Sequence, residues 1–389
     1  MRTKVSIKGE DALKAGNNFM EHKPSKNKNL HKASQAKNDE FYTQLVDIEK
    51  ELKHYKDQFR GKVIYCNCDD PFESNFFKYF ASNFNAFGLK QLIATSYRPS
   101  PIANTQLGLF GGGEVIVKSK GRPKITANKF IINEVDDMDD DGAFDLHDIA
   151  EQLKANKNNE WAPLKGEGDF RSAESIELLK KADIVVTNPP FSLFREYVAQ
   201  LIEYNKKFLI IGNLNAITYA EVFKLIKKDK LWLGYNNGPK TYLVPDSYEQ
   251  DNIFVGTDGK KYAQMGNTGW YTNLDISKRH ESLVLYKKYT PEEYQKYDNY
   301  DAIEVSKVSE IPMNYNRVMG VPVTFLDKYN PKQFEILGIT DRDPNHKYRV
   351  KMYTREDSPK YNDLNRRAAI RINGNLKPVY ARLLIKFKK

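Results

Sequence analysis

The fold of this chain is decided by residues 182–191, which read ADIVVTNPPF. The β-branched run at 184–186 predicts a short strand that is buried on both faces, as in a parallel sheet. Because two prolines cannot continue a β-ladder, we expect the chain to leave the sheet at the carboxyl end of this strand. Open α/β sheets bind their ligands at that end. A strand followed by a plain proline turn is the alternative interpretation.

Strands and helices alternate on both sides of this stretch. The sequence predicts strands at 62–67, 90–97, 184–186, 207–211 and 231–234, and helices at 39–58, 74–87, 172–181, 192–204 and 220–228. Strand, helix and strand at this spacing form βαβ units, so we predict an α/β fold with a parallel sheet.

Two regions depart from this alternation. Residues 98–167 contain glycine and aspartate runs and predict an insertion, in which 114–118 and 130–132 would pair as a hairpin. Its segment KGRPK at 120–124 resembles the core of a minor-groove AT-hook, although we favour a basic turn there. After Tyr235 short β-like pieces, at 241–244, 253–255 and 270–274, predict a β-rich, irregular region outside the core sheet.

The positive charge lies at the two ends of the chain. The net charge is +10. Residues 1–38 hold 9 Lys/Arg against 3 Asp/Glu, and residues 342–389 hold 14 against 4, so the middle is net negative. Tyrosines interleave with the C-terminal cations, a pattern that suits backbone contact and base stacking on nucleic acid. Solvated tails are the alternative interpretation.

Several classes of protein are excluded by composition. The sequence contains no run of about 18 apolar residues, so we expect no membrane span. Its first residues lack the apolar core of a signal peptide. Cys66 and Cys68 are the two cysteines of the sequence and are separated by a single residue, so we expect no disulfide and a cytoplasmic protein. The six histidines are scattered, and no nucleophilic triad, zinc motif or phosphate loop occurs. We expect chemistry without a metal.

Residues 188–191 suit chemistry on an exocyclic amine of a nucleobase. Such a nitrogen is a poor nucleophile, because its lone pair is delocalised into the ring. The side-chain carbonyl of Asn188 and the backbone carbonyl of Pro189 can accept both amino hydrogens and localise that pair. Phe191 can stack on the base, which must first be flipped out of a duplex. Methyl transfer from a sulfonium fits these limits.

These residues also resemble the adenine-specific DNA methyltransferase family typified by the EcoRI modification enzyme. The resemblance covers roughly residues 28–340, with a further match in RLLIK at 382–386. Its segments are DEFYTQ at 39–44, YCNCDDP at 65–71, SNFFKYF at 74–80, GDFR at 168–171, SIELLKK at 175–181, NPPFSLF at 188–194, YDNYDAI at 297–303 and MGVP at 319–322.

The resemblance implies a Rossmann-like sheet with helices on both faces that binds S-adenosyl-L-methionine, and N6-adenine methylation of double-stranded DNA by a monomer. It implies a basic arm at 1–38, a catalytic domain at 39–235 and a target-recognition region at 236–389. The implied catalytic residues are Asn188, Pro189, Pro190 and Phe191. The implied cofactor-binding residues are Tyr42 and Thr43 at the methionine part, Asn67, Asp69 and Asp70 after the first strand, and Asp169 and Phe170 at the adenine.

The sequence departs from most methyltransferases in the turn at 67–75, which holds no glycine. No acidic residue follows the second strand to bind the ribose. Two alternatives stay open here: methylation of RNA adenine or of a protein glutamine, and a DNA-binding protein with an inactive methyltransferase site. The palindrome GAATTC is only the first guess for the recognition sequence.

Overall fold

The computed structural model describes residues 42–68, 74–97, 127–136, 158–244, 248–249, 252–342 and 346–388. Several predictions fall outside these ranges. They are the basic arm at 1–38, the cofactor residues Asp69 and Asp70, the hairpin half at 114–118, the AT-hook-like segment at 120–124 and the acidic run beyond Asp136.

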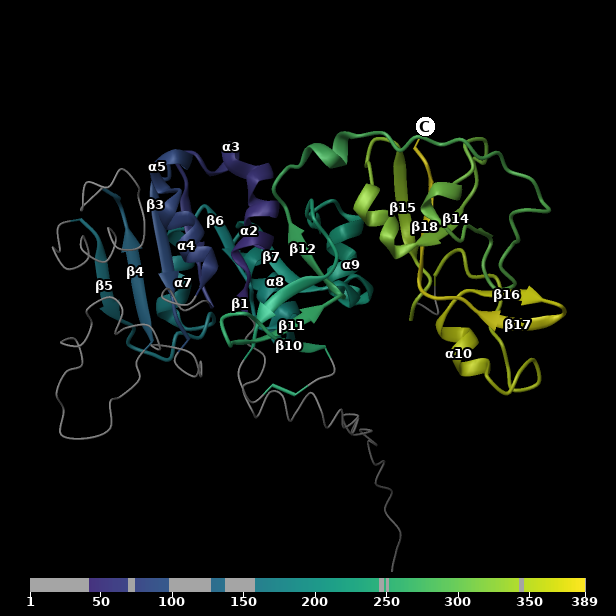
Figure 1. Cartoon of the computed structure of the whole chain (residues 1–389). Helices are drawn as coiled ribbons and strands as arrows, with labels where there is room; N and C mark the ends of the chain where they lie inside the picture. Colours follow the sequence, from purple (N-terminus) through teal and green to yellow (C-terminus); the bar gives the residue numbers. More distant parts are fainter. Residues whose placement is uncertain are drawn as a thin grey trace, which may run out of the picture.

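A sheet of eight strands forms the centre of the described structure (Figure 1). Its order is β5-β4-β3-β2-β6-β7-β12-β8. The four central strands β3, β2, β6 and β7 are parallel, while β4 and β12 pair antiparallel with their neighbours. The strands are β2 (Val63–Cys66), β3 (Gln91–Thr95), β4 (Asn128–Ile132), β5 (Glu160–Pro163), β6 (Ile184–Thr187), β7 (Lys207–Asn213), β8 (Trp232–Leu233) and β12 (Thr268–Thr272).

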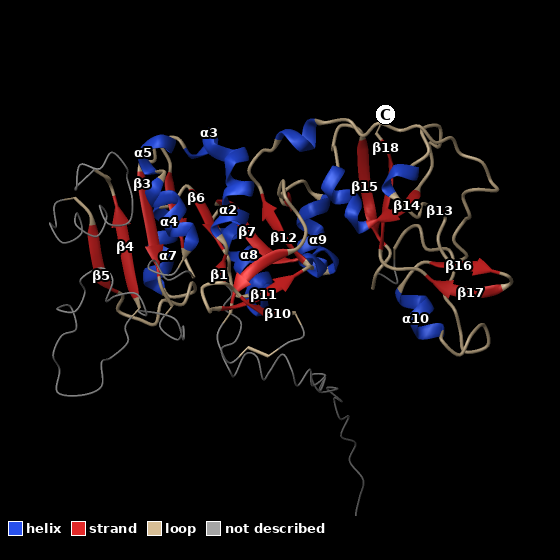
Figure 2. Cartoon of the chain, viewed as in Figure 1, coloured by secondary structure: helices blue, strands red, loops and turns tan. Residues whose placement is uncertain are grey.

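Helices cover both faces of this sheet (Figure 2). Successive side chains of a strand point to opposite faces, so Val63 and Tyr65 join one apolar core, and Ile64 and Cys66 join the other. Because both faces are buried, these strands are continuous apolar runs. The first core is closed by α7 (Ala173–Lys181), α8 (Phe194–Glu203) and α9 (Ala220–Lys227), and the second by α2 (Leu45–Leu52), α3 (Lys56–Phe59), α4 (Asn75–Ser82) and α5 (Phe84–Phe87).

Local capping explains where several helices begin and end. The Ser74 hydroxyl accepts from the backbone N–H of Phe76 at 3.1 Å, and the Ser172 hydroxyl accepts from that of Ser175 at 3.2 Å. Gly88 ends α5 in the left-handed region at φ 59°. The N-cap at Ser172 and the stop at Gly88 agree with the helices predicted at 172–181 and 74–87.

Two further sheets adjoin the central one. The first has the order β1-β9-β11-β10, and the second, near the C-terminus, has the order β13-β14-β18-β15. The helix α9 packs against β15, and the Lys227 ammonium donates to the carbonyl of Leu337 at 2.7 Å. The elements are β1 (Tyr42–Thr43), β9 (Lys240–Leu243), β10 (Ile253–Val255), β11 (Lys261–Met265), β13 (Ile303–Glu304), β14 (Met319–Pro322), β15 (Phe334–Ile339) and β18 (Arg382–Phe387), with α10 (Tyr361–Arg366) and the hairpin β16 (Ala369–Ile372) and β17 (Asn375–Pro378).

Short 3-10 helices connect several of these elements. They are η1 (Lys53–Tyr55), η3 (Phe191–Leu193), η4 (Leu214–Thr218), η5 (Ser277–His280), η6 (Val308–Glu310) and η7 (Val323–Lys328). None of the helices within the described ranges is long and apolar enough to cross a membrane.

The structure corrects three sequence predictions. The helix predicted at 39–58 is wrong at its start, because residues 42–43 form β1 and pair with β9. The supposed insertion supplies β4 and β5, which extend the main sheet instead of forming a separate hairpin. The region after Tyr235 does not stay outside the core sheet, because β12 is inserted between β7 and β8. All three errors concern pairing between distant segments, which local periodicity does not encode.

Candidate active site

The strand order reverses between β2 and β6. From β2 the chain continues to β3 on one side, and after the excursion through β4 and β5 it enters β6 and β7 on the other side. Such a reversal leaves a crevice at the carboxyl ends of the two strands, where open α/β sheets bind ligands. Asn67 directly follows β2 and Asn188 directly follows β6. Two predicted site residues therefore meet at this point.

Hydrogen bonds join the ends of these two strands. The Thr187 hydroxyl donates to the backbone carbonyl of Asn67, and the Tyr197 hydroxyl donates to its side-chain oxygen Oδ1. The Tyr197 ring packs edge-on against Phe170, with centroids 5.0 Å apart. All four side chains are buried. The carboxyl ends of β2 and β6 are therefore one rigid unit, with Asn188 as the next residue.

The residues after β6 form a stiff, enclosed turn. Asn188 is only 9% exposed, and Pro189 is also buried. Phe191 is half-buried and begins η3, and its ring meets that of Tyr242 edge-on at 6.5 Å. Proline fixes its own φ, so the carbonyl between the two prolines has little freedom to move. The turn holds two oxygen acceptors and one aromatic ring in fixed places.

Thr43 reaches the same region from the small sheet. In the pairing of β1 with β9 it lies opposite Tyr242, and its carbonyl accepts from Asn75 Nδ2 at 2.7 Å. Thr43 is 3% exposed, and within the part of the chain that the structure describes its hydroxyl has no hydrogen-bond partner. Buried hydroxyls are nearly always bonded, so this one fits a partner supplied by a ligand. The predicted Tyr42 precedes it in β1.

Asp169 lies beside the carboxyl end of β3. The preceding Gly168 has φ +79°, and a Cβ there would lie 2.0 Å from the backbone oxygen of Ser96, so this approach requires glycine. The Asp169 carboxylate accepts from Arg171 Nη2 at 2.8 Å and Nε at 3.0 Å. These hydrogen bonds lower the pKa of Asp169. The carboxylate is therefore an ionised acceptor at neutral pH.

The structure thus brings together Thr43, Asn67, Asp169, Phe170, Asn188, Pro189, Pro190 and Phe191, while Asp69 and Asp70 lie outside the described residues. Phe170 is buried in the core, and Asp169 is already engaged by Arg171. Sequence reasoning missed the supporting side chains of Thr187, Tyr197 and Tyr242. Tyr197 lies on the buried side of α8, and a buried tyrosine needs a hydrogen-bond partner, which was the available signal.

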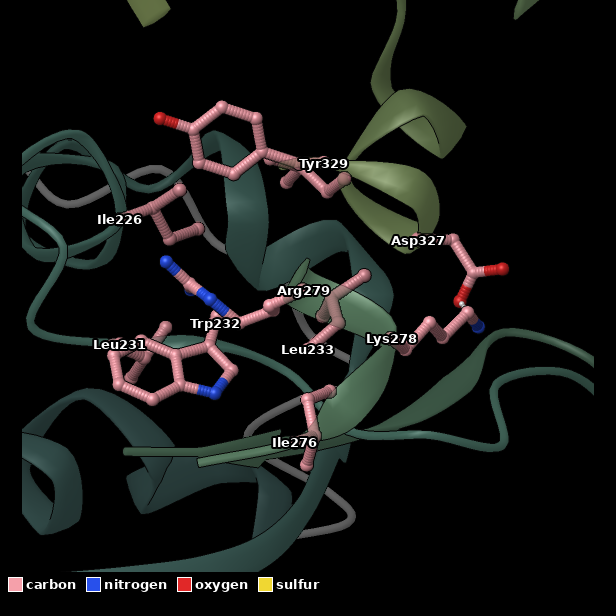
Figure 3. Close-up of a pocket in the computed structure, with 10 residues that line it drawn as sticks. Ile226, Leu231, Trp232, Leu233, Ile276, Lys278, Arg279, Asp327 and Tyr329 are labelled. Carbon is pink, nitrogen blue, oxygen red and sulfur yellow. Dashed lines mark hydrogen bonds and ion pairs between the residues drawn. The ribbon is translucent and has the colours of Figure 1, made fainter. Parts of the chain in front are cut away.

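A pocket elsewhere in the molecule has a different character (Figure 3). It lies between β8, η5 and η7, where the Arg279 guanidinium stacks 4.0 Å from the centre of the Trp232 ring. Arg279 pairs with Asp229 at 2.9 Å, and Lys278 pairs with Asp327 at 2.9 Å. Because both cations are already paired, we interpret this pocket as a packed junction between elements.

No group of three or more His, Cys, Asp or Glu side chains that could hold a metal ion occurs among the residues for which the structure is described. In its described part, the candidate site is made of amide, hydroxyl and aromatic groups with the carboxylate of Asp169, which is paired with Arg171. Such a set can bind and orient an uncharged nucleobase and a charged small molecule.

Comparisons with known proteins agree with this arrangement. Residues 29–388 match the model of a family described as adenine-specific methyltransferase EcoRI. Type II methyltransferase M.EcoRI of Escherichia coli is 48% identical over 329 residues, which cover 82% of this chain and 92% of that protein. Type II methyltransferase M.MpnI of Mycoplasma pneumoniae is 39% identical over 315 residues, which cover 79% and 84%. No solved structure matches the chain significantly.

Proposed function

Because the chain belongs to the EcoRI family of adenine-specific methyltransferases, we propose that it transfers a methyl group from S-adenosyl-L-methionine to N6 of an adenine flipped out of duplex DNA. Its place would be the modification half of a type II restriction-modification system. The family description names adenine, which speaks against methylation of a protein glutamine. The observation that carries the proposal is the position of Asn188 at the reversal of strand order, beside the end of β2.

Asn188 would prepare the target amine as a hydrogen-bond acceptor. Its side-chain carbonyl and the backbone carbonyl of Pro189 accept the two amino hydrogens, so the nitrogen lone pair turns toward the donor of the methyl group. Preorganised acceptors need no rearrangement during the reaction. Because the two carbonyls are shielded from solvent, their electrostatic interaction with the amine is stronger than it would be in water. Phe191 is half-buried and leaves part of its ring to stack on the base. The nitrogen would form its bond to the methyl carbon as the bond between that carbon and sulfur breaks, which leaves a neutral thioether, and the extra proton on the nitrogen would pass to solvent.

S-adenosyl-L-methionine would be held on the β2 side of the crevice. When bound, it supplies a methyl group on a positively charged sulfur, which is a strong electrophile. Thr43 fits a role in holding this molecule. Its buried hydroxyl has no hydrogen-bond partner in the described part of the chain and could donate to the methionine carboxylate. Asn67 and Asp169 would line the pocket, with Tyr42, Asp69, Asp70 and Phe170 as further predicted contacts.

The finer architecture is also part of the proposal. We interpret the central sheet as Rossmann-like, because its strands wind in both directions from β2 with helices on both faces. Residues 1–38 would be a basic arm, and the part after β12 would recognise the target, so the catalytic domain extends beyond its predicted boundary at Tyr235. We further propose that a monomer is the active form.

Asn188→Ala tests the mechanism. Transfer of a tritiated methyl group to duplex DNA should be abolished, while binding of S-adenosyl-L-methionine, measured by calorimetry, should stay within about twofold of wild type. Asn188→Asp keeps an acceptor and should retain measurable transfer. Asn215→Ala alters an exposed asparagine after β7 and serves as the control. Full transfer by the Asn188→Ala variant would refute the role of this residue.

A further inference from the structure

We propose that the hairpin β16–β17 enters the major groove of the substrate DNA, and that Asn373 and Asn375 at its tip read base edges there. The inference rests on the proposed function, because it names the surface that selects the site to be methylated. Recognition of the DNA sequence is thereby assigned to two residues that lie outside the segments shared with the methyltransferase family.

The base of the hairpin is held rigidly. The Ala369 carbonyl accepts from the backbone N–H of Asp298 at 2.8 Å, and the Ala369 N–H donates to Asn299 Oδ1 at 2.8 Å. Gln295 Nε2 donates to the carbonyl of Arg371 at 2.6 Å, and Arg371 Nε pairs with Asp298 at 2.7 Å. These contacts fix the direction of β16, and β17 follows through its antiparallel pairing with β16, so little conformational entropy is lost when the tip binds.

The tip itself is exposed. Residues 371–375 are all exposed, and Figure 1 shows the hairpin projecting at the right-hand edge of the picture, below the C-terminus. Asn373 and Gly374 have φ 50° and 77°, which is the left-handed pair of a tight two-residue turn. Within the described residues, the hydrogen bond found for a tip amide runs from Asn375 Nδ2 to the Asn373 carbonyl and is long at 3.4 Å. A long bond of this kind is readily exchanged for one to a base.

A ribbon of two strands has the right size for DNA. Paired strands lie about 4.8 Å apart, and the major groove is about 12 Å wide and admits a two-stranded ribbon. Asparagine amides form paired hydrogen bonds with N6 and N7 of adenine in that groove. Two exposed asparagines at the tip therefore supply the donor and acceptor groups that sequence reading needs.

The C-terminal region that contains the hairpin carries an excess of cations. Residues 346–388 hold 12 Lys/Arg against 3 Asp/Glu. Lys351 is paired with Asp357. Over the described ranges, no ion pair is found for four exposed cations of the same region, which are Arg355, Lys360, Arg366 and Lys377. Phosphate contacts of this kind fix the position of a protein on DNA, while the groove contacts select the sequence.

The hairpin lies on the appropriate side of the molecule. Figure 1 shows β12 running upward, and β7 is antiparallel to it, so the carboxyl ends of the parallel strands face the lower side. The helix α10 and the hairpin also lie toward the lower side of the C-terminal part. In this view, the hairpin and the carboxyl ends of the parallel strands therefore lie toward the same side.

The test compares Asn373→Gly and Asn375→Ala with the control Lys377→Ala. Glycine keeps the left-handed turn and removes only the amide. Each asparagine variant should lower kcat/KM on the cognate duplex by about 5- to 150-fold. In cells that express the variant, sequencing of N6-methyladenine should show a methylated motif relaxed at one base pair. Lys377→Ala should weaken methylation of all sequences equally, with a shallower salt dependence.

An unchanged motif and an unchanged ratio of cognate to near-cognate rates in both asparagine variants would overturn the inference and leave the proposed function standing. All three variants should unfold with the same thermal midpoint as the wild-type protein, because the changed side chains are exposed. A wild-type protein that methylates no adenine in DNA would instead refute the proposed function, and the inference with it.

Discussion

Thr43→Val should make the ligand-free protein more stable and its binding of S-adenosyl-L-methionine weaker. Thr43 is 3% exposed, and its hydroxyl finds no hydrogen-bond partner within the described structure. A buried hydroxyl without a partner costs about 1–3 kcal/mol. Valine has nearly the same shape and suits a strand. We therefore expect the free energy of unfolding without ligand to rise by about 1–3 kcal/mol.

The same substitution removes a donor that we assign to the methionine carboxylate. A hydrogen bond to a charged group contributes about 1.5–3 kcal/mol. The dissociation constant of S-adenosyl-L-methionine should therefore rise by about tenfold to 150-fold, since each 1.4 kcal/mol is a factor of ten. Stability and affinity would move in opposite directions, which a purely structural residue does not produce.

Urea unfolding without ligand and calorimetric titration with S-adenosyl-L-methionine measure the two effects. Thr187→Val is the matched control, because Thr187 is equally buried on a strand but its hydroxyl donates to the Asn67 carbonyl. That variant should lose about 1–3 kcal/mol of stability, because an acceptor is left without its donor. If Thr43→Val destabilises the ligand-free protein and leaves the dissociation constant unchanged, the reasoning about the Thr43 hydroxyl is wrong.

Two further predictions concern charged groups. Arg382→Ala should lower the free energy of unfolding in urea by about 3–5 kcal/mol, because it leaves the buried Glu304 carboxylate, which Arg382 Nη2 contacts at 2.6 Å, without its cation. Lys386→Ala on the same strand breaks an exposed ion pair and should lower it by under about 1 kcal/mol. Equal losses in the two variants would contradict this reasoning. Arg171 lowers the pKa of Asp169, so this pair stabilises the protein above about pH 4 and its contribution is lost as the pH falls through the lowered pKa. The stability difference between wild type and Arg171→Gln should therefore shrink on acidification below pH 4, and a difference that grows would refute the assignment.

Local sequence signals predicted the central part of the fold well. The strand at 184–186 and the helices at 74–87 and 172–181 depend on residues that are close together in the sequence. The parallel order of neighbouring βα units follows from the helical connection between successive strands. The apolar run at 184–186 correctly predicted a buried strand, because each side chain of this run faces one of the two apolar cores. The prolines after it correctly marked the end of the strand.

The predictions that failed depend on partners far away in the chain. Residues 42–43 were assigned to a helix, yet they form a strand because β9 offers them a pairing edge about 200 residues later. The strand β12 enters the main sheet from a region predicted to lie outside it, since the place between β7 and β8 buries all five of its residues. Pairing of this kind is a tertiary property, and it overrides weak local preference.

By itself, the sequence determined the α/β class of the fold and the end of strand β6, and it supplied the proposed role of Asn188, because each depends on residue types within a short stretch. Only the tertiary structure decided which side chains meet there. Asn67 is joined to Thr187 and Tyr197 across about 120 residues or more of chain, and Thr43 comes to the site from a different sheet. A hydrogen bond between distant residues depends on the path of the whole chain, so no local pattern records it.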